Sequence, residues 1–136
     1  MTEWLSSPIT RWSSPGLTDS QANAYTRRLF TRAERETVQV PALWPFEFVN
    51  TLCTMQRRNI MRPHQVDATL AQAQRFGIVI DAEPVKQAIL LATARRAGLL
   101  AYDAAYVELA ERRGLPLATR DRAMRLAARR IGIALV

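Results

Sequence analysis

The feature that most constrains the fold of this chain is the alternation of short apolar segments with longer stretches of helical periodicity. Strands that alternate with helices pair in parallel through right-handed crossovers. The apolar segments lack the polar alternation of a half-exposed strand, so we expect a sheet covered on both faces. The expected strands span residues 38–41, 78–80, 117–119 and 133–136.

Proline and glycine mark the ends of the expected helices. Proline fits the first turn of a helix and glycine its C-terminal stop. Thr18 and Gln21 have the spacing of a capping box, which opens the first helix. The expected helices span residues 18–36, 45–58, 63–76, 84–96, 102–113 and 121–130.

The chain has 136 residues, and we expect one domain over 1–136. Residues 1–17 contain Pro8, Pro15 and Gly16, so this segment is expected to be irregular. No apolar run reaches the ~18 residues of a membrane span, and no signal-peptide pattern opens the sequence. These observations predict a soluble cytoplasmic protein that does not contact a membrane.

The chain has a single cysteine, Cys53, which excludes an intrachain disulfide and a cysteine-rich zinc site. Cys53 falls in an apolar helical stretch and is expected to be a buried, inert thiol. Trp44 and Phe46 flank Pro45 in the same stretch and are expected to pack in the core. Val66, Leu70 and Ala73 share one helical face, which indicates either core or a groove for a partner protein.

The chain carries a net charge of +7, and nearly all of its basic residues are arginine. Arginine matches the geometry of phosphate better than lysine does. Most of its Arg-Arg doublets fall near the ends of expected helices, where cations complement the helix dipole. Two interpretations remain open: solvated helix ends, or a basic surface that attracts a polyanion such as nucleic acid. The doublets begin at Arg27, Arg57, Arg95, Arg112 and Arg129.

Three acidic residues lie where an expected strand or connector meets a helix. Asp121 follows the strand 117–119, Asp103 is in the first turn of its helix, and Glu47 lies one turn into the helix after the strand 38–41. Ligands of parallel sheets bind beyond the carboxyl ends of the strands. Few oxygen ligands suit Mg²⁺ or Mn²⁺, which also bind substrate phosphate. The alternative is that Asp103 and Asp121 complement helix dipoles and Glu47 forms a buried ion pair.

Residues 40–50, 100–110 and 114–121 resemble the PIN domain, specifically the VapC-type toxins of bacterial toxin–antitoxin pairs. The resemblance implies a three-layer α/β sandwich around a short parallel sheet. It also implies a Mg²⁺- or Mn²⁺-dependent endoribonuclease that acts on RNA, forms a homodimer and is neutralised by a small antitoxin protein. The implied catalytic and metal-ligating residues are Glu47, Asp103 and Asp121, with Asn50 and Thr119 as supporting polar groups.

The N-terminal residues depart from the family pattern, in which an apolar first strand ends in aspartate, then a small residue, then serine or threonine. Matching Trp12 to a tryptophan of the following helix places Leu5 at the aspartate and Ser7 at the hydroxyl position. The first strand is therefore expected to be atypical or missing. This leaves a second hypothesis, a catalytically impaired PIN-like domain that only binds antitoxin or RNA. A DNA-associated basic protein is a third, but no recognition motif supports it.

Overall fold

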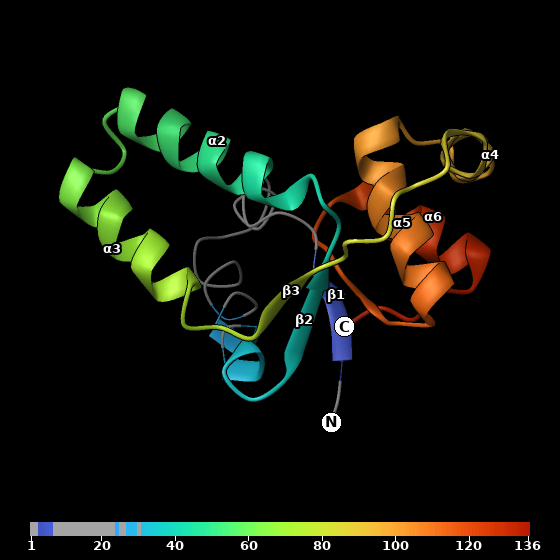
Figure 1. Cartoon of the computed structure of the whole chain (residues 1–136), viewed down its shortest axis with the longest axis horizontal. Helices are drawn as coiled ribbons and strands as arrows, with labels where there is room; N and C mark the ends of the chain where they lie inside the picture. Colours follow the sequence, from blue (N-terminus) through green and yellow to red (C-terminus); the bar gives the residue numbers. More distant parts are fainter. Residues whose placement is uncertain (1–2, 7–23, 25–26, 30) are drawn as a thin grey trace.

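A four-stranded parallel sheet lies between helices in the computed structural model of the chain (Figure 1). The structure describes residues 3–6, 24, 27–29 and 31–136. The strand order is β3-β2-β1-β4. The strands are β1 (Glu3–Ser6), β2 (Thr37–Val40), β3 (Ile78–Ile80) and β4 (Leu117–Ala118).

The N-terminal strand β1 occupies the middle of this sheet, between β2 and β4. Leu5 is in register with Gln39 of β2 and with Leu117 of β4. Of the two expectations for the first strand, atypical or missing, the second is therefore wrong. Its sequence gave a weak signal because the strand is only four residues long and includes Glu3 and Ser6. The neighbouring strands supply the backbone partners that the local sequence did not predict.

The helices agree with the predicted alternation. Residues 27–29 and 31–33 are helical, while the expected start of that helix at Thr18 lies outside the described residues. In Figure 1, α2 and α3 lie on one side of the sheet and α4, α5 and α6 on the other. The helices after β2 are α2 (Trp44–Arg57), α3 (Pro63–Ala73), α4 (Gln87–Ala97), α5 (Ala101–Arg113) and α6 (Arg122–Ile131).

The core is built around α5, which packs against β1, α4 and α6. Every residue from 104 to 110 is buried, although a surface helix would expose half of them. Tyr106, Leu109, Leu117 and Met124 are the large side chains that fill this centre. Because α5 is buried along most of its length, it fixes the position of whatever its two ends carry.

Two glycines end α4 and α5, as predicted. Gly98 has φ of 65° and Gly114 has φ of 64°, the left-handed conformation that glycine adopts without steric cost. The following amides turn back onto the helix: Leu99 N donates to Ala94 O, and Leu115 N donates to Ala110 O. The chain can therefore reverse within a few residues and bring α5 and β4 against their neighbours.

Some boundaries differ from the sequence-based expectation. Helix α4 begins at Gln87 rather than at Pro84, since Lys86 still has an extended backbone. The expected strand 133–136 is reduced to an isolated bridge between Leu117 and Leu135. Strand β3 was expected to be buried, but it forms one edge of the sheet, and Val79 and Ile80 are about half exposed.

Two side chains of α2 face differently from the expectation. Trp44 is buried and stacks on Phe48 with ring centroids 5.0 Å apart, as expected for core packing. Phe46 is 79% exposed, and Cys53 is exposed rather than buried. The stretch around Pro45 is mostly apolar, so its spacing does not separate the inner from the outer face of the helix.

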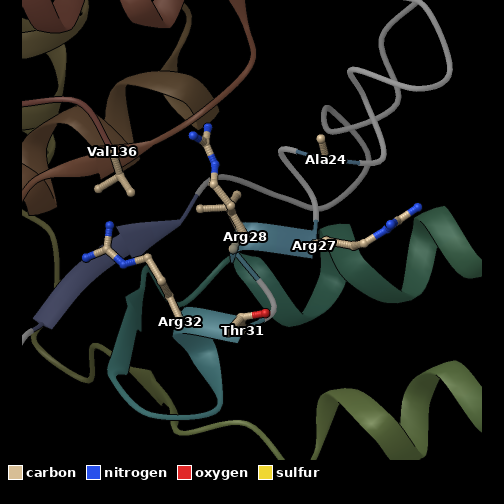
Figure 2. Close-up of a pocket in the computed structure, with 7 residues that line it drawn as sticks. Ala24, Arg27, Arg28, Thr31, Arg32 and Val136 are labelled. Carbon is tan, nitrogen blue, oxygen red and sulfur yellow. The ribbon is translucent and has the colours of Figure 1, made fainter.

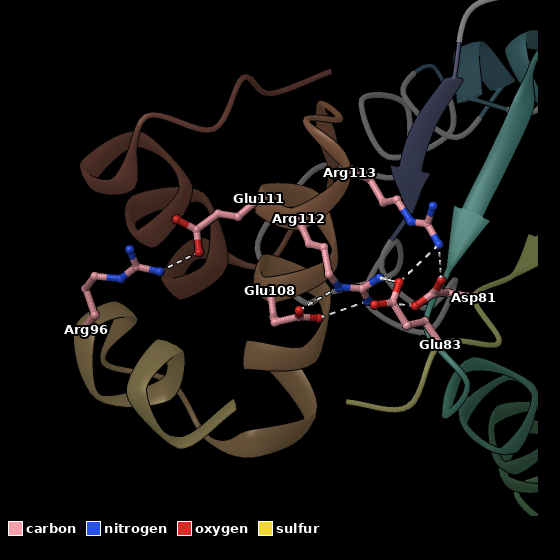
Figure 3. Close-up of polar contacts among 7 residues, drawn as sticks. All are labelled: Asp81, Glu83, Arg96, Glu108, Glu111, Arg112 and Arg113. Carbon is pink, nitrogen blue, oxygen red and sulfur yellow. Dashed lines mark hydrogen bonds and ion pairs between the residues drawn. The ribbon is translucent and has the colours of Figure 1, made fainter. Parts of the chain in front are cut away.

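A cluster of ion pairs fastens the C-terminal end of α5 to the segment after β3 (Figure 3). The Arg112 guanidinium donates to Asp81 (2.6 Å), to Glu83 (2.8 Å) and to Glu108 (2.8 Å). Arg113 donates to the other oxygen of Asp81 at 2.7 Å. Asp81 and Glu108 are both buried, so their charges depend on these arginines for compensation.

The charges in this cluster shift the pKa of its members. Burial alone raises the pKa of Asp81, but the hydrogen bonds and positive charges of Arg112 and Arg113 outweigh it, and the pKa lies below its ordinary value. The hydrogen bonds that Arg112 donates to Glu108 and Asp81 raise the pKa of Arg112. Both shifts favour the ionised forms of Asp81 and Arg112.

We predict that Arg112→Met lowers the free energy of unfolding by about 2–4 kcal/mol, because it leaves the buried carboxylates of Asp81 and Glu108 partly uncompensated. The matched control is Arg96→Met. Arg96, on α4, pairs with Glu111 of α5, but its side chain is 54% exposed, so its loss should cost less than about 1 kcal/mol. Urea unfolding of both variants measures the difference. Equal losses would show that the buried cluster contributes no more than a surface pair.

We further predict that the stabilisation from Asp81 disappears in acid. Because the folded-state pKa lies below the unfolded value of about 3.9, the contribution is present above pH ~4 and is lost as the pH falls through the folded-state pKa. Unfolding free energies of the native chain and of Asp81→Asn, measured from pH 6 to pH 2, should therefore converge at the acidic end. A difference that stays constant over this range would contradict the assignment.

Candidate functional site

The topology brings the three candidate acidic residues toward one edge of the sheet. Strands β2 and β4 both pair in parallel with β1, so all three strands end at the same edge. Glu47 lies in the first turn of α2, which follows β2, and Asp121 directly precedes α6, which follows β4. Neighbouring strands are separated by ~4.8 Å, so the ends of β2 and β4 lie about 10 Å apart across β1.

Glu47 is held by a residue of α5. The buried hydroxyl of Tyr106 donates a hydrogen bond to Oε2 of Glu47, at 2.5 Å. Glu47 itself is partly buried, and Thr51 donates its hydroxyl to the Glu47 carbonyl one turn later. Tyr106 therefore links α2 to α5 and sets the position of this carboxylate.

Asp103 lies one turn before Tyr106 on α5, in the first turn of the helix. Residues three apart share a helix face, so Asp103 and Tyr106 are neighbours on α5. Because Tyr106 contacts Glu47, this spacing brings the α5 and α2 acids into the same region. Asp103 is partly buried, which fits a carboxylate at the rim of the core rather than on an open surface.

Thr119 and Asp121 form a short polar turn between β4 and α6. The buried Thr119 hydroxyl accepts a hydrogen bond from Asp121 N at 3.1 Å. Oδ1 of Asp121 then accepts from Met124 N at 2.8 Å, which caps the N-terminus of α6. Arg125 donates to the Thr119 carbonyl at 3.0 Å. Asp121 thus caps the helix end at which the alternative interpretation placed it to complement the dipole, and the capping bond fixes the direction of the carboxylate.

The remaining predicted site residue, Asn50, is exposed on α2, and its carbonyl accepts the hydroxyl of Thr54. The sequence interpretation named no role for Tyr106, although Tyr106 is the residue that contacts Glu47. Its position three residues after Asp103 was the available signal. Only the tertiary structure shows that a residue 59 positions earlier in the chain receives its hydrogen bond.

The next question is whether the acidic side chains at this edge could bind a divalent cation. Among the described residues, no group of three or more His, Cys, Asp or Glu side chains is close enough to hold a metal ion. However, Mg²⁺ retains several waters and is commonly bound by one or two carboxylates together with a substrate phosphate. The carboxylates at this edge have the chemistry for that mode of binding, in which a substrate phosphate would complete the coordination.

Comparison with known proteins decides the family. The family model "PIN domain" matches residues 15–130. The chain belongs to the PIN domain family. The crystal structure of PAE2754 from Pyrobaculum aerophilum is similar in fold, with a TM-score of 0.62 and 21% sequence identity. That similarity covers 96% of this chain and 90% of the other. Among curated proteins, none matches the sequence.

The family carries a general activity. PIN domains are typically nucleases that depend on divalent metals such as Mg²⁺. The α/β architecture with its short parallel sheet is the fold predicted for this family from the sequence. Among the described residues, no helix is long and apolar enough to cross a membrane.

The two roles of Asp121 can be separated by substitution. Asparagine also accepts the hydrogen bond of an N-cap, so Asp121→Asn should change the unfolding free energy by less than about 0.5 kcal/mol. Asp121→Ala removes the cap and should cost about 1 kcal/mol. If Asp121 also serves catalysis, both variants lose RNA cleavage equally. Thermal unfolding and a cleavage assay on the same preparations test this. Full activity in Asp121→Asn would leave Asp121 with the capping role alone.

Proposed function

We propose that this PIN domain is a metal-dependent endoribonuclease toxin that hydrolyses RNA phosphodiesters. The observation that carries the proposal is the hydrogen bond between Tyr106 and Glu47, because it joins two helices that each bring an acidic residue to the same sheet edge. Glu47, Asp103 and Asp121 are the proposed catalytic and metal-ligating residues.

A bound Mg²⁺ or Mn²⁺ would activate a water molecule and stabilise the negative charge that develops on the phosphodiester. The protein contributes orientation. Tyr106 fixes one oxygen of Glu47, Thr119 fixes the backbone of Asp121, and burial of α5 fixes the position of Asp103. In the proposed reaction, an oxygen–phosphorus bond forms from water and the bond to the leaving sugar oxygen breaks, without a covalent bond to the protein.

The surface chemistry is consistent with RNA as the substrate. The net charge of +7 favours association with a polyanion. Figure 2 shows Arg27, Arg28 and Arg32 beside the C-terminal Val136, where they line a cavity of about 560 Å³. We also propose that Thr119 and Asn50 act as supporting polar groups near the acidic residues.

The proposed protein partners are an antitoxin that neutralises the enzyme in the cytoplasm and a second copy of this chain. An apolar groove of about 300 Å³ lies between α2, α3 and β3, and Val49, Leu70 and Ile80 are among its exposed lining residues. Leu70 and Ala73 of α3 line this groove, and Ala73 is also buried in the core. The α3 face that was predicted to be either core or groove therefore contributes to the core and to the groove. On the other side of the sheet, Leu91 and Leu100 are more than half exposed and would be covered in a homodimer.

The second candidate function is a PIN domain that binds antitoxin or RNA without cleaving it. The observation that favours it lies at β1, which ends at Ser6 after Leu5, where the family pattern has its first aspartate. Calorimetry with Mg²⁺ separates the candidates, because an enzyme should bind the metal at least in the presence of uncleavable RNA. Cleavage gained by Leu5→Asp in an otherwise inactive chain would establish the second candidate.

We predict that Asp103→Asn slows Mn²⁺-dependent cleavage of single-stranded RNA by about 100-fold or more, the size of effect expected for losing one stabiliser of transition-state charge. The control is Asp67→Asn, which removes the same charge from an exposed position on α3 and should leave the rate unchanged. Gel analysis of labelled RNA over time measures both rates. Equal rates for the native chain and Asp103→Asn would exclude the proposed site.

A further inference from the structure

The side chain of Arg120 has two buried nitrogens that lack hydrogen-bond partners. Its terminal atoms Nη1 and Nη2 expose almost no surface, and neither has a hydrogen-bond partner within the part of the chain that the structure describes. The residue as a whole is partly exposed. A guanidinium is always charged and offers five N–H donors, so burying its fork without acceptors is unfavourable.

Other arginines of the C-terminal half show that this arrangement is unusual. Arg112 and Arg113 donate to buried carboxylates, Arg125 donates to the Thr119 carbonyl, and Arg130 donates to the Ala97 carbonyl at 2.6 Å. The fold therefore supplies acceptors to these guanidinium groups. Unfavourable groups that persist in folded proteins concentrate at functional sites, where a ligand provides the missing interaction.

Arg120 lies within the candidate site by its position in the chain. It stands between Thr119, which is fully buried at the end of β4, and Asp121, which caps α6. Consecutive Cα atoms are ~3.8 Å apart, so the Arg120 side chain can reach ligands at this strand end. The N-terminus of α6 adds a partial positive charge at the same place.

We propose that Arg120 binds a phosphate group of the RNA substrate, next to the phosphodiester that the acidic residues would cleave. This inference rests on the proposed function. The guanidinium fork matches two phosphate oxygens with parallel hydrogen bonds. Turning the fork from its covered position toward a phosphate breaks no hydrogen bond of Nη1 or Nη2 with the described residues, and it relieves their desolvation.

A phosphate fits this position better than a carboxylate of a protein partner. Asp121 is adjacent in the chain, and Asp103 and Glu47 belong to the same edge, so a further carboxylate group would meet like charges there. A phosphodiester meets them as well, but a divalent cation bound with the substrate neutralises that charge. In this arrangement Arg120 is the positively charged protein group that would contact the RNA backbone from the β4 side of the site.

The test measures binding of an uncleavable fluorescent single-stranded RNA to the full chain in the presence of Mg²⁺, so that the cation remains and no cleavage occurs. Arg120→Met should weaken binding about tenfold and reduce the slope of log K against log salt by about 0.7, the value for one lost phosphate contact on a single strand. Arg129→Met, on the exposed last turn of α6, loses the same charge and should change binding less than twofold. Arg120→Lys should recover part of the affinity, since it restores the charge without the fork.

Thermal unfolding without RNA separates this role from a structural one. Removal of a buried guanidinium without partners should leave the unfolding temperature of Arg120→Met unchanged or raise it. Affinity that falls while the unfolding temperature is maintained supports the proposal. Unchanged affinity, a fall equal to that of Arg129→Met, a fall that accompanies a lower unfolding temperature, or no RNA binding by the native chain would overturn it. Binding of polyglutamate, which carries carboxylates in place of phosphates, is measured as well. If Arg120→Met binds RNA normally and loses only affinity for polyglutamate, the proposal is also overturned.

The outcome is distinguishable from that of the ribonuclease proposal. A chain that binds RNA through Arg120 but does not cleave it with Mn²⁺ leaves this inference standing and rejects the enzyme. A chain that cleaves RNA while Arg120→Met binds normally rejects only the role of Arg120.

Discussion

Burial of α5 against the sheet is the interaction on which the rest of this structure depends. Its residues 104–110 are all buried, so the helix cannot rotate or slide without exposing the core. Its N-terminal turn carries Asp103 and, one turn later, Tyr106, which holds Glu47. Its C-terminal turn carries Arg112, which joins buried Asp81 and Glu108. One buried helix thus positions the candidate site at one end and an ion-pair cluster at the other.

The candidate site combines rigid positioning with an incomplete set of partners. Glu47 and Asp121 are each oriented by a hydrogen bond from the protein, which lowers the entropy lost when they meet a ligand. Among the described residues the acids form no ready-made metal cage, and the fork of Arg120 lacks acceptors. Both observations have the same physical meaning if the nucleic acid supplies the missing groups, since its phosphates can ligate a cation and accept from a guanidinium at once.

The family resemblance carried by residues 40–50, 100–110 and 114–121 agrees with the family model over residues 15–130. The segments that sequence patterns misjudged share a cause. Strand β1 is too short and polar to be recognised locally, and β3 is apolar although it lies at the sheet edge. Cys53 and Phe46 lie in a mostly apolar stretch whose spacing does not distinguish the two faces of α2. In each case the deciding quantity is the packing of neighbours, which periodicity does not contain.

The sequence by itself determined the alternation of strands and helices, their parallel pairing and the helix ends, because proline, glycine and apolar spacing act over a few residues. It also placed Asp121 at the start of a helix, where the structure shows that its carboxylate caps α6 through a local hydrogen bond. Only the tertiary structure decided that β1 is central, that Tyr106 reaches Glu47, and that Arg112 and Arg113 meet Asp81. These are contacts between residues about 30 or more positions apart, and their energy depends on burial that exists only after the chain has folded.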